Sequence, residues 1–323
     1  MTVPPDAPAS TVDRPASPRK LVPVGRRVSW HAGGALVVVM CAVYLARRHW
    51  PVIETGAGRL AVADRGWLLV ATAATLATWA CSALAQQGAV TRSLPARRLL
   101  AVQFAASAAN QVLPAGLGAG AVNLRFLTRC GLSVTRSATA LAVKATAATV
   151  VRGCLIVALA PACPGALRFP HVSAAAWAVA VALVATAVVL LSGPLRRVLR
   201  AVLTDVHAVH EVPARAAALW GGSLAFAALH AGVVIAVTQA IDLPLPPAQV
   251  ALAYLAASSA AVLLPTPGGL GSLDAALALA LTLAGAPGSA AASAVLGYRL
   301  LTVWLPLLPG LVALGVLVRR RVL

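Results

Sequence analysis

The sequence predicts an all-α polytopic membrane protein that contains an internal duplication. Of its 323 residues, 60% are hydrophobic and only 11% are charged, and the mean hydropathy is +0.88. A soluble domain is closer to about half apolar and about a quarter charged. Long apolar runs recur along the chain, short arginine-bearing loops separate them, and a Pro/Gly phrase interrupts two of them. These three observations together indicate a bundle of membrane helices.

Six apolar runs approach or exceed the length that a helix needs to cross a bilayer. In chain order they cover residues 30–46, 66–85, 137–160, 173–191, 219–241 and 294–318. Residues 1–29 are rich in Pro, Ala and Ser and are expected to form a disordered cytoplasmic tail. Residues 30–323 are expected to form a single transmembrane domain.

Two further apolar stretches are interrupted by related phrases. Leu113-Pro114-Ala115-Gly116-Leu117-Gly118 recurs as Leu264-Pro265-Thr266-Pro267-Gly268-Gly269-Leu270-Gly271. Downstream, Gly131 falls at the place of Gly285, and Lys144 nearly at the place of Arg299. The residues that break the helices are Pro114, Gly116, Gly118, Pro265, Pro267, Gly268, Gly269 and Gly271. Paired broken segments in two halves of a membrane chain point to a transporter-like binding site.

The length of the broken segments predicts how they lie in the membrane. Each half is about 13–16 residues, roughly 20–24 Å of helix against a hydrocarbon core of about 30 Å. Two such halves joined by a Pro/Gly turn favour a re-entrant hairpin. We expect one hairpin at about residues 99–130 and another at about 249–285. Eight ordinary spans, with the third and seventh kinked, stay open as the alternative.

The distribution of arginine predicts the topology. The formal net charge of +18 lies mostly in short loops, so it encodes orientation and does not indicate nucleic acid. With both termini cytoplasmic, the first hairpin enters from the cytoplasm and the second from outside, which is an inverted-topology repeat. The mixed loop at 47–65 fits least well. The excess of arginine over lysine, together with abundant alanine, is typical of a GC-rich bacterial genome, and we expect a multi-pass protein of the bacterial inner membrane.

Polar side chains inside the apolar runs are the candidates for binding a lipid headgroup. Lys144 and Arg152 are eight residues apart on one predicted helix and have no acid nearby in sequence. They suit an anionic headgroup or a wet cavity, unless each reaches an interface. Asn110, Gln111 and Asn123 bracket the first break. They either line a headgroup path or satisfy backbone groups that Pro114 leaves free.

Arg299 and Asp274 are the charged candidates of the second copy. Arg299 could contact a lipid phosphate, pair with Asp274, or extend to the outer interface. Asp274 could instead cap the helix that it begins. His230 and Gln239 lie on roughly one face of a predicted span, where an interhelical hydrogen bond is favoured over a proton relay.

Catalytic and metal-binding patterns are absent from the sequence. It has no Ser/His/Asp arrangement, no phosphate-loop lysine motif and no carboxylate pair for acid–base chemistry. The five cysteines show no CxxC or Cys/His ligand spacing. We therefore expect no enzyme activity, no metal site and no cofactor.

The broken phrases resemble those of the lysylphosphatidylglycerol synthase transmembrane family, the flippase-like membrane domain of the multiple peptide resistance proteins. The second copy carries the stronger match, with Pro265 to Asp274, then Gly285, and a Tyr298-Arg299 pair before Trp304 and Pro306. The first copy keeps its glycines but lacks the family's arginine and glutamate, which leaves the substrate of that hairpin open. Arg125 could stand in for the downstream arginine. The resemblance covers roughly residues 30–320.

The resemblance implies the function of the membrane domain alone, because the chain ends directly after its last predicted helix. The leading hypothesis is a flippase-like protein that moves a polar or anionic-headed lipid, with Tyr298 among the headgroup contacts and membrane lipids as partners. The alternative is a membrane subunit that docks a separately encoded synthase or glycosyltransferase. An integral-membrane enzyme is the weakest option, and a homo-oligomer stays open.

Overall fold

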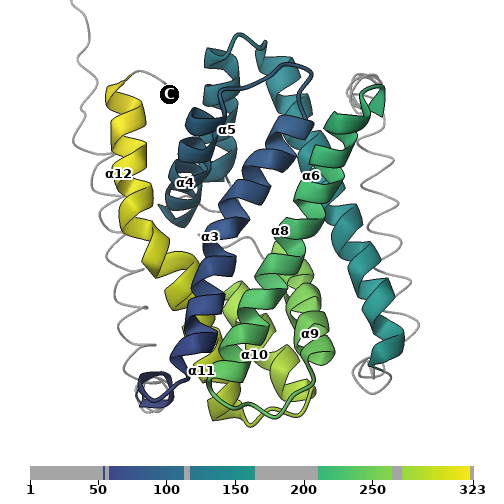
Figure 1. Cartoon of the computed structure of the whole chain (residues 1–323), viewed down its shortest axis with the longest axis vertical. Helices are drawn as coiled ribbons and strands as arrows, with labels where there is room; N and C mark the ends of the chain where they lie inside the picture. Colours follow the sequence, from purple (N-terminus) through teal and green to yellow (C-terminus); the bar gives the residue numbers. More distant parts are fainter. Residues whose placement is uncertain (1–53, 55–57, 113–116, 164–209, 264–270, 321–323) are drawn as a thin grey trace, which may run out of the picture. The chain divides into compact units, whose positions relative to one another are not determined.

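Helix is the only regular structure among the residues that the structure, a computed structural model, describes (Figure 1). These are residue 54 and residues 58–112, 117–163, 210–263 and 271–320, all within the body formed by Pro51–Leu323. The predicted tail at 1–29 and the predicted spans at 30–46 and 173–191 lie outside the described residues. So do Pro114, Gly116, Pro265, Pro267, Gly268 and Gly269 of the two breaks.

The helices follow one another in an order that matches the predicted segments. Their bounds are α3 (Arg65–Gly88), α4 (Ala96–Val112), α5 (Leu117–Arg129), α6 (Val134–Leu159), α8 (Pro213–Ala240), α9 (Pro247–Ala260), α10 (Ser272–Leu283), α11 (Gly288–Arg299) and α12 (Leu305–Arg319). Short 3-10 turns, η2 (Ala160–Ala162) and η3 (Ala261–Leu263), extend α6 and α9. A π-helical turn, η5 (Leu300–Trp304), joins α11 to α12.

Four helical segments in the described part of the chain are long and apolar enough to cross a membrane. They are Arg65–Gly88, Val134–Ala162, Pro213–Ala240 and Gly288–Arg319. They contain or closely match the spans expected at 66–85, 137–160, 219–241 and 294–318. The prediction of an all-α polytopic membrane protein is therefore confirmed.

Helix boundaries follow local capping chemistry. The carboxylate of Asp64 accepts the Trp67 N–H at 3.0 Å and begins α3, and the Ser133 hydroxyl accepts the Arg136 N–H at 3.3 Å and begins α6. α8 and α9 begin with Pro213 and Pro247, whose fixed φ suits the first helical position. These caps and prolines satisfy or remove N–H groups that a helix start leaves unpaired.

The broken segments form two pairs of short helices. α4 packs against α5, and α9 packs against α10. Each pair ends at a glycine of positive φ, Gly131 at 89° and Gly285 at 106°, the two positions that the sequence comparison equated. The connections at residues 113–116 and 264–270 lie outside the described residues, so re-entry into the membrane stays a prediction.

The two helix pairs lie at opposite ends of a central antiparallel pair formed by α3 and α8. The Asp64 N–H donates to the Ala240 carbonyl at 2.9 Å, which joins the start of α3 to the end of α8. At the other end, Gly88 lies directly against the backbone of Leu219. Figure 1 shows α4 and α5 beside one end of this pair, and α9 and α10 beside the other.

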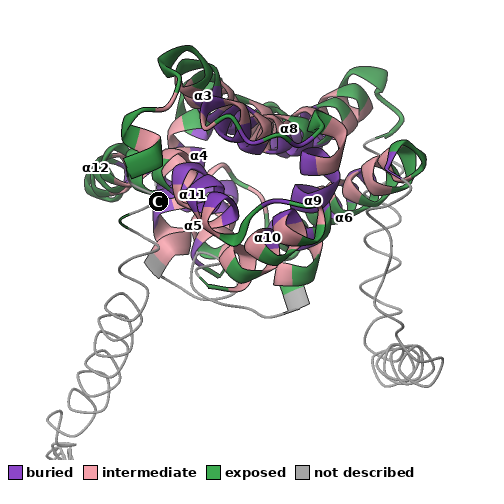
Figure 2. Ribbon diagram, turned by 90° about the horizontal axis from the view of Figure 1, so that it is seen from below, coloured by how far each residue is buried: buried purple, intermediate pink, exposed green. Residues whose placement is uncertain are grey.

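Burial separates an inner core from an apolar outer surface. Figure 2 shows buried residues gathered between the helices and exposed residues on the outward faces. Several large apolar side chains on those outward faces are strongly exposed, including Leu69 (70%), Val157 (73%), Leu308 (73%) and Val312 (66%). An outer surface of this kind fits contact with lipid better than contact with water.

Candidate functional site

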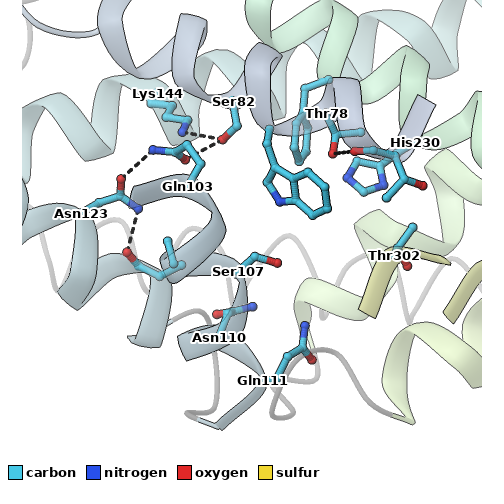
Figure 3. A pocket seen from close by; sticks show the side chains of 15 residues that line it. Thr78, Ser82, Gln103, Ser107, Asn110, Gln111, Asn123, Lys144, His230 and Thr302 are labelled. Carbon is cyan, nitrogen blue, oxygen red and sulfur yellow. Dashed lines mark hydrogen bonds between the residues drawn. The ribbon is translucent and has the colours of Figure 1, made fainter. Parts of the chain in front are cut away.

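A polar cavity of about 230 Å³ lies between α3, α4, α5, α6, α8 and η5 (Figure 3). Its polar lining consists of Thr75, Thr78, Ser82, Gln103, Ser107, Asn110, Gln111, Asn123, Lys144, His230 and Thr302. Trp79 and Phe226 add aromatic surface to the same cavity. Most of this lining comes from helices that are otherwise apolar, so the polar groups are concentrated where the helices face one another.

A chain of hydrogen bonds crosses four helices on one wall of the cavity. The Lys144 ammonium donates to the Ser82 hydroxyl at 3.0 Å, and Ser82 donates to the Gln103 carbonyl oxygen at 2.9 Å. The Gln103 amide donates to Asn123 Oδ1 at 3.0 Å, and Asn123 Nδ2 donates to the Ala119 carbonyl at 2.8 Å. Each polar group has its direction fixed by the next, so the lysine is held in place from α6 through α3 and α4 to α5.

Lys144 brings a positive charge to the cavity. The part of the chain that the structure describes contains one ion pair, between Arg299 and Asp274, and it does not involve Lys144. An ammonium has three N–H donors, and Ser82 takes one of them. A cation removed from water is costly unless an anion or hydrogen-bond acceptors compensate it. The cavity therefore has a donor-rich, positively charged pole.

Asn110 and Gln111 belong to the last turn of α4. Their carbonyl oxygens, Oδ1 and Oε1, are buried, and no group among the described residues donates a hydrogen bond to them. Both side chains line the cavity, as does Asn123, and their contact with a headgroup stays a prediction. Buried acceptors require donors, which either water or a ligand can supply.

A second set of hydrogen-bonding groups, on the side of the cavity opposite Lys144, begins at His230 and continues away from the cavity. The His230 ring lines the cavity, and its Nδ1 lies 3.2 Å from the Tyr298 hydroxyl. The Tyr298 hydroxyl lies 3.4 Å from that of Tyr254. Three helices, α8, α11 and α9, thus meet through one hydroxyl–hydroxyl–imidazole chain. This is the interhelical hydrogen bond expected at His230. Gln239 is not among the residues that line the cavity.

Arg299 and Asp274 pair with each other and do not line the cavity. Asp274 Oδ1 accepts from Arg299 Nε, while Oδ2 accepts the Gly271 N–H at 2.8 Å. The two alternatives for Asp274, ion pair and helix cap, therefore both hold. The carboxylate joins the start of α10 to the end of α11, and the Arg299 side chain is 8% exposed.

Four of the eight predicted headgroup residues line the cavity and four do not. Lys144, Asn110, Gln111 and Asn123 line it, whereas Tyr298, Arg152, Arg299 and Asp274 lie elsewhere. Arg152 lies near His230 and Tyr254. Its Nε is buried and has no hydrogen-bond partner among the described residues. Lys144 and Arg152 were expected on one face of their helix, but Lys144 lines the cavity and Arg152 does not.

Sequence reasoning did not select several lining residues, although a signal for them exists. Thr75, Thr78 and Ser82 lie at intervals of three and four, as do Gln103, Ser107 and Asn110. Polar residues at that spacing in an apolar helix form one stripe on one face. Two such stripes on consecutive helices predict a shared polar interface between them.

In the described ranges, no group of three or more His, Cys, Asp and Glu residues could hold a metal ion.

The apolar helices and their exposed outer faces define a multi-pass membrane protein. The chain belongs to the lysylphosphatidylglycerol synthase TM region family, which it matches over residues 28–310. The match includes both broken phrases and every residue of the cavity. A search of curated proteins found no match to the chain. The family places the protein in lipid metabolism or transport.

Proposed function

We propose that the protein moves a polar or anionic-headed lipid across a bacterial inner membrane, with the headgroup held in the cavity beside Lys144. The observation that supports this most strongly is a half-buried cation that faces a cavity and has no carboxylate partner among the described residues. Charged groups inside membrane proteins face cavities and mark the paths of polar substrates. An anionic headgroup would supply the compensation that Lys144 needs.

The size and lining of the cavity suit a headgroup without its acyl chains. Pockets for drug-sized ligands occupy about 300–1,000 Å³, and this cavity of about 230 Å³ is smaller. The acyl chains would stay in lipid, against the exposed apolar faces. Asn110 and Gln111 would accept hydrogen bonds from headgroup hydroxyls or amines, or from water that accompanies them. Binding and reorientation of this kind involve no covalent step, so we propose no enzyme activity.

The arrangement of the short helices supports an inverted repeat of two re-entrant hairpins. α4 and α5 lie at one end of the α3–α8 pair, and α9 and α10 lie at the other. Broken helices that approach the membrane midplane from opposite sides are typical of transporters in which one site opens alternately to each side. We therefore propose that both termini are cytoplasmic, as the arginine distribution predicts.

Leaflet exchange in proteoliposomes tests this function. The wild-type chain alone is reconstituted with labelled anionic, zwitterionic or aminoacylated lipids, and exchange is measured by quenching of the outer-leaflet label. Lys144→Met should lower exchange of the preferred lipid about tenfold or more, since a hydrogen bond to a charged group is worth about 1.5–3 kcal/mol. Lys144→Arg should retain part of it. Arg136→Gln, an exposed cation of the same helix, is the matched control.

Two results would contradict the proposal. Exchange that is unaffected by Lys144→Met would remove Lys144 from the mechanism. A folded, monodisperse wild-type protein that exchanges none of the lipids would favour the alternative, a membrane subunit that docks a separately encoded synthase or glycosyltransferase.

A further inference from the structure

We propose that His230 is a second recognition residue of the cavity and that it selects lipids whose headgroups carry hydroxyl groups. This inference rests on the proposed function, because it concerns the same cavity. His230 comes from α8 and Lys144 from α6. Figure 3 shows the two side chains on different sides of the cavity, with Ser107, Asn110 and Gln111 between and below them. A headgroup held by its phosphate at Lys144 would extend toward the imidazole.

The imidazole is held in one orientation by the groups around it. Phe226 meets the ring edge-on, with centroids 4.6 Å apart, and Tyr254 lies nearly parallel to it at 6.1 Å. Nδ1 is occupied by the Tyr298 hydroxyl. Tyr298 is itself only 3% exposed and has little freedom to move. Nδ1 is therefore occupied by a protein hydroxyl, and Nε2, which has no hydrogen bond among the described residues, is the nitrogen available to a ligand in the cavity that His230 lines.

The hydroxyl chain leaves Nε2 able to donate or to accept. A neutral imidazole has one protonated nitrogen and one acceptor nitrogen. If the Tyr298 hydroxyl donates to Nδ1, then Nε2 has the proton and donates into the cavity. If Nδ1 donates to Tyr298, which then donates to Tyr254, Nε2 accepts. The change of tautomer requires only that the hydroxyl protons of Tyr298 and Tyr254 reorient.

A hydroxyl group is the ligand that satisfies both arrangements. It can donate and accept, so it forms a hydrogen bond with Nε2 in either tautomer. A phosphate oxygen can only accept and an ammonium group can only donate, so each of them bonds to Nε2 in one tautomer only. The geometry therefore favours an anionic lipid with headgroup hydroxyls over one with a bare phosphodiester.

Exchange of two lipids of equal charge tests this selectivity. Labelled phosphatidylglycerol carries two headgroup hydroxyls, and phosphatidylmethanol carries none. The wild type should exchange phosphatidylglycerol about twofold to tenfold faster, the effect of one hydrogen bond of about 0.5–1.5 kcal/mol. His230→Phe keeps an aromatic ring and should abolish this preference while both lipids still exchange. His230→Gln, which keeps a polar group, should retain part of the preference.

Tyr298→Phe tests the positioning role. It removes the hydroxyl that holds Nδ1 and should weaken the preference without lowering phosphatidylmethanol exchange. Thr238→Val is the matched control, because Thr238 is a buried α8 residue whose hydroxyl donates to the Ile235 carbonyl at 2.8 Å and has no other hydrogen bond among the described residues. A wild type that exchanges neither lipid contradicts the proposed function itself. Equal wild-type rates for the two lipids, or an unchanged ratio in both His230 variants, would overturn the role of His230 alone.

Discussion

The two broken segments share a sequence phrase, and each second half-helix begins near a glycine, Gly118 or Gly271. The two positions require glycine for different physical reasons. At Gly118, a Cβ atom would lie 2.1 Å from the Ala109 carbonyl oxygen, so the glycine permits α5 to approach α4. At Gly271 nothing lies within 4 Å of such an atom, but φ is 86°. One glycine is required by close packing and the other by backbone conformation.

The buried or half-buried cations near the two segments also differ, in whether a carboxylate neutralises them. Beside α10, the carboxylate of Asp274 compensates Arg299, and both contribute to holding helices together. Beside α4 and α5, hydrogen bonds to neutral groups hold Lys144, which has no carboxylate partner among the described residues. Duplicated positions can therefore diverge: Arg299 pairs with a carboxylate, whereas Lys144 faces a cavity and, in our proposal, binds a headgroup. The presence or absence of a carboxylate partner distinguishes Arg299 from Lys144, whereas their positions in the repeat do not.

Removal of the Asp274 carboxylate should have the largest effect on stability. Asp274→Ala deletes both the cap of α10 and the partner of the buried Arg299. Breaking a buried ion pair on one side costs about 3–5 kcal/mol, and we expect the lower end because Asp274 is 30% exposed. Thermal unfolding in detergent, followed by loss of the monodisperse gel-filtration peak, measures the change.

Asp274→Asn separates the two roles of this residue. Its amide oxygen can still accept the Gly271 N–H, so only the charge is lost. If Asp274→Asn unfolds at the wild-type temperature, the ion pair does not stabilise the protein and the contrast with Lys144 fails.

Lys144→Met is the corresponding substitution beside the first segment, on α6. It should leave the unfolding temperature unchanged or raise it, because it removes a half-buried cation that has no anionic partner among the described residues.

Close packing at the first break should give the next largest effect. Gly118→Ala forces α5 away from the Ala109 backbone, and overpacking of this kind costs about 1–3 kcal/mol. The shift would also displace Asn123 and loosen the chain of hydrogen bonds to Lys144. Lipid exchange should fall together with the unfolding temperature. Gly120→Ala, two residues on in the same helix and open to space, is the control and should be tolerated.

The sequence predicted the helices better than the site. Hydropathy and length placed all four described spans and all four half-helices within six residues of their observed bounds, because each depends on local composition. The Pro/Gly phrases likewise marked where the half-helices stop and start. These features require no knowledge of which helix packs against which.

The site depends on packing that a single sequence does not reveal. Lys144 and Asn123 were identifiable as polar residues in apolar runs, but Ser82 and Gln103 join them only because α3 and α4 face α6 and α5. Arg152 and Arg299 looked equivalent to Lys144 by residue type. Only the arrangement of neighbouring helices shows that Arg299 meets a carboxylate and that Lys144 meets a cavity.

Backbone conformation at the second break should give the smallest effect. Gly271→Ala introduces no clash, but it places a Cβ in a positive-φ region that costs an L-residue about 1–2 kcal/mol. The strain falls on the residue whose N–H bonds to Asp274, so the start of α10 should loosen while the cavity beside α4 and α5 is unaffected. Thermal unfolding and lipid exchange, measured together, should show a lower unfolding temperature with near wild-type exchange. Gly288→Ala, another helix-start glycine with open space and no positive φ, is the control. Exchange that falls as far as in Gly118→Ala would mean that the two breaks act as one unit, and the contrast between a structural and a ligand-binding segment would be wrong.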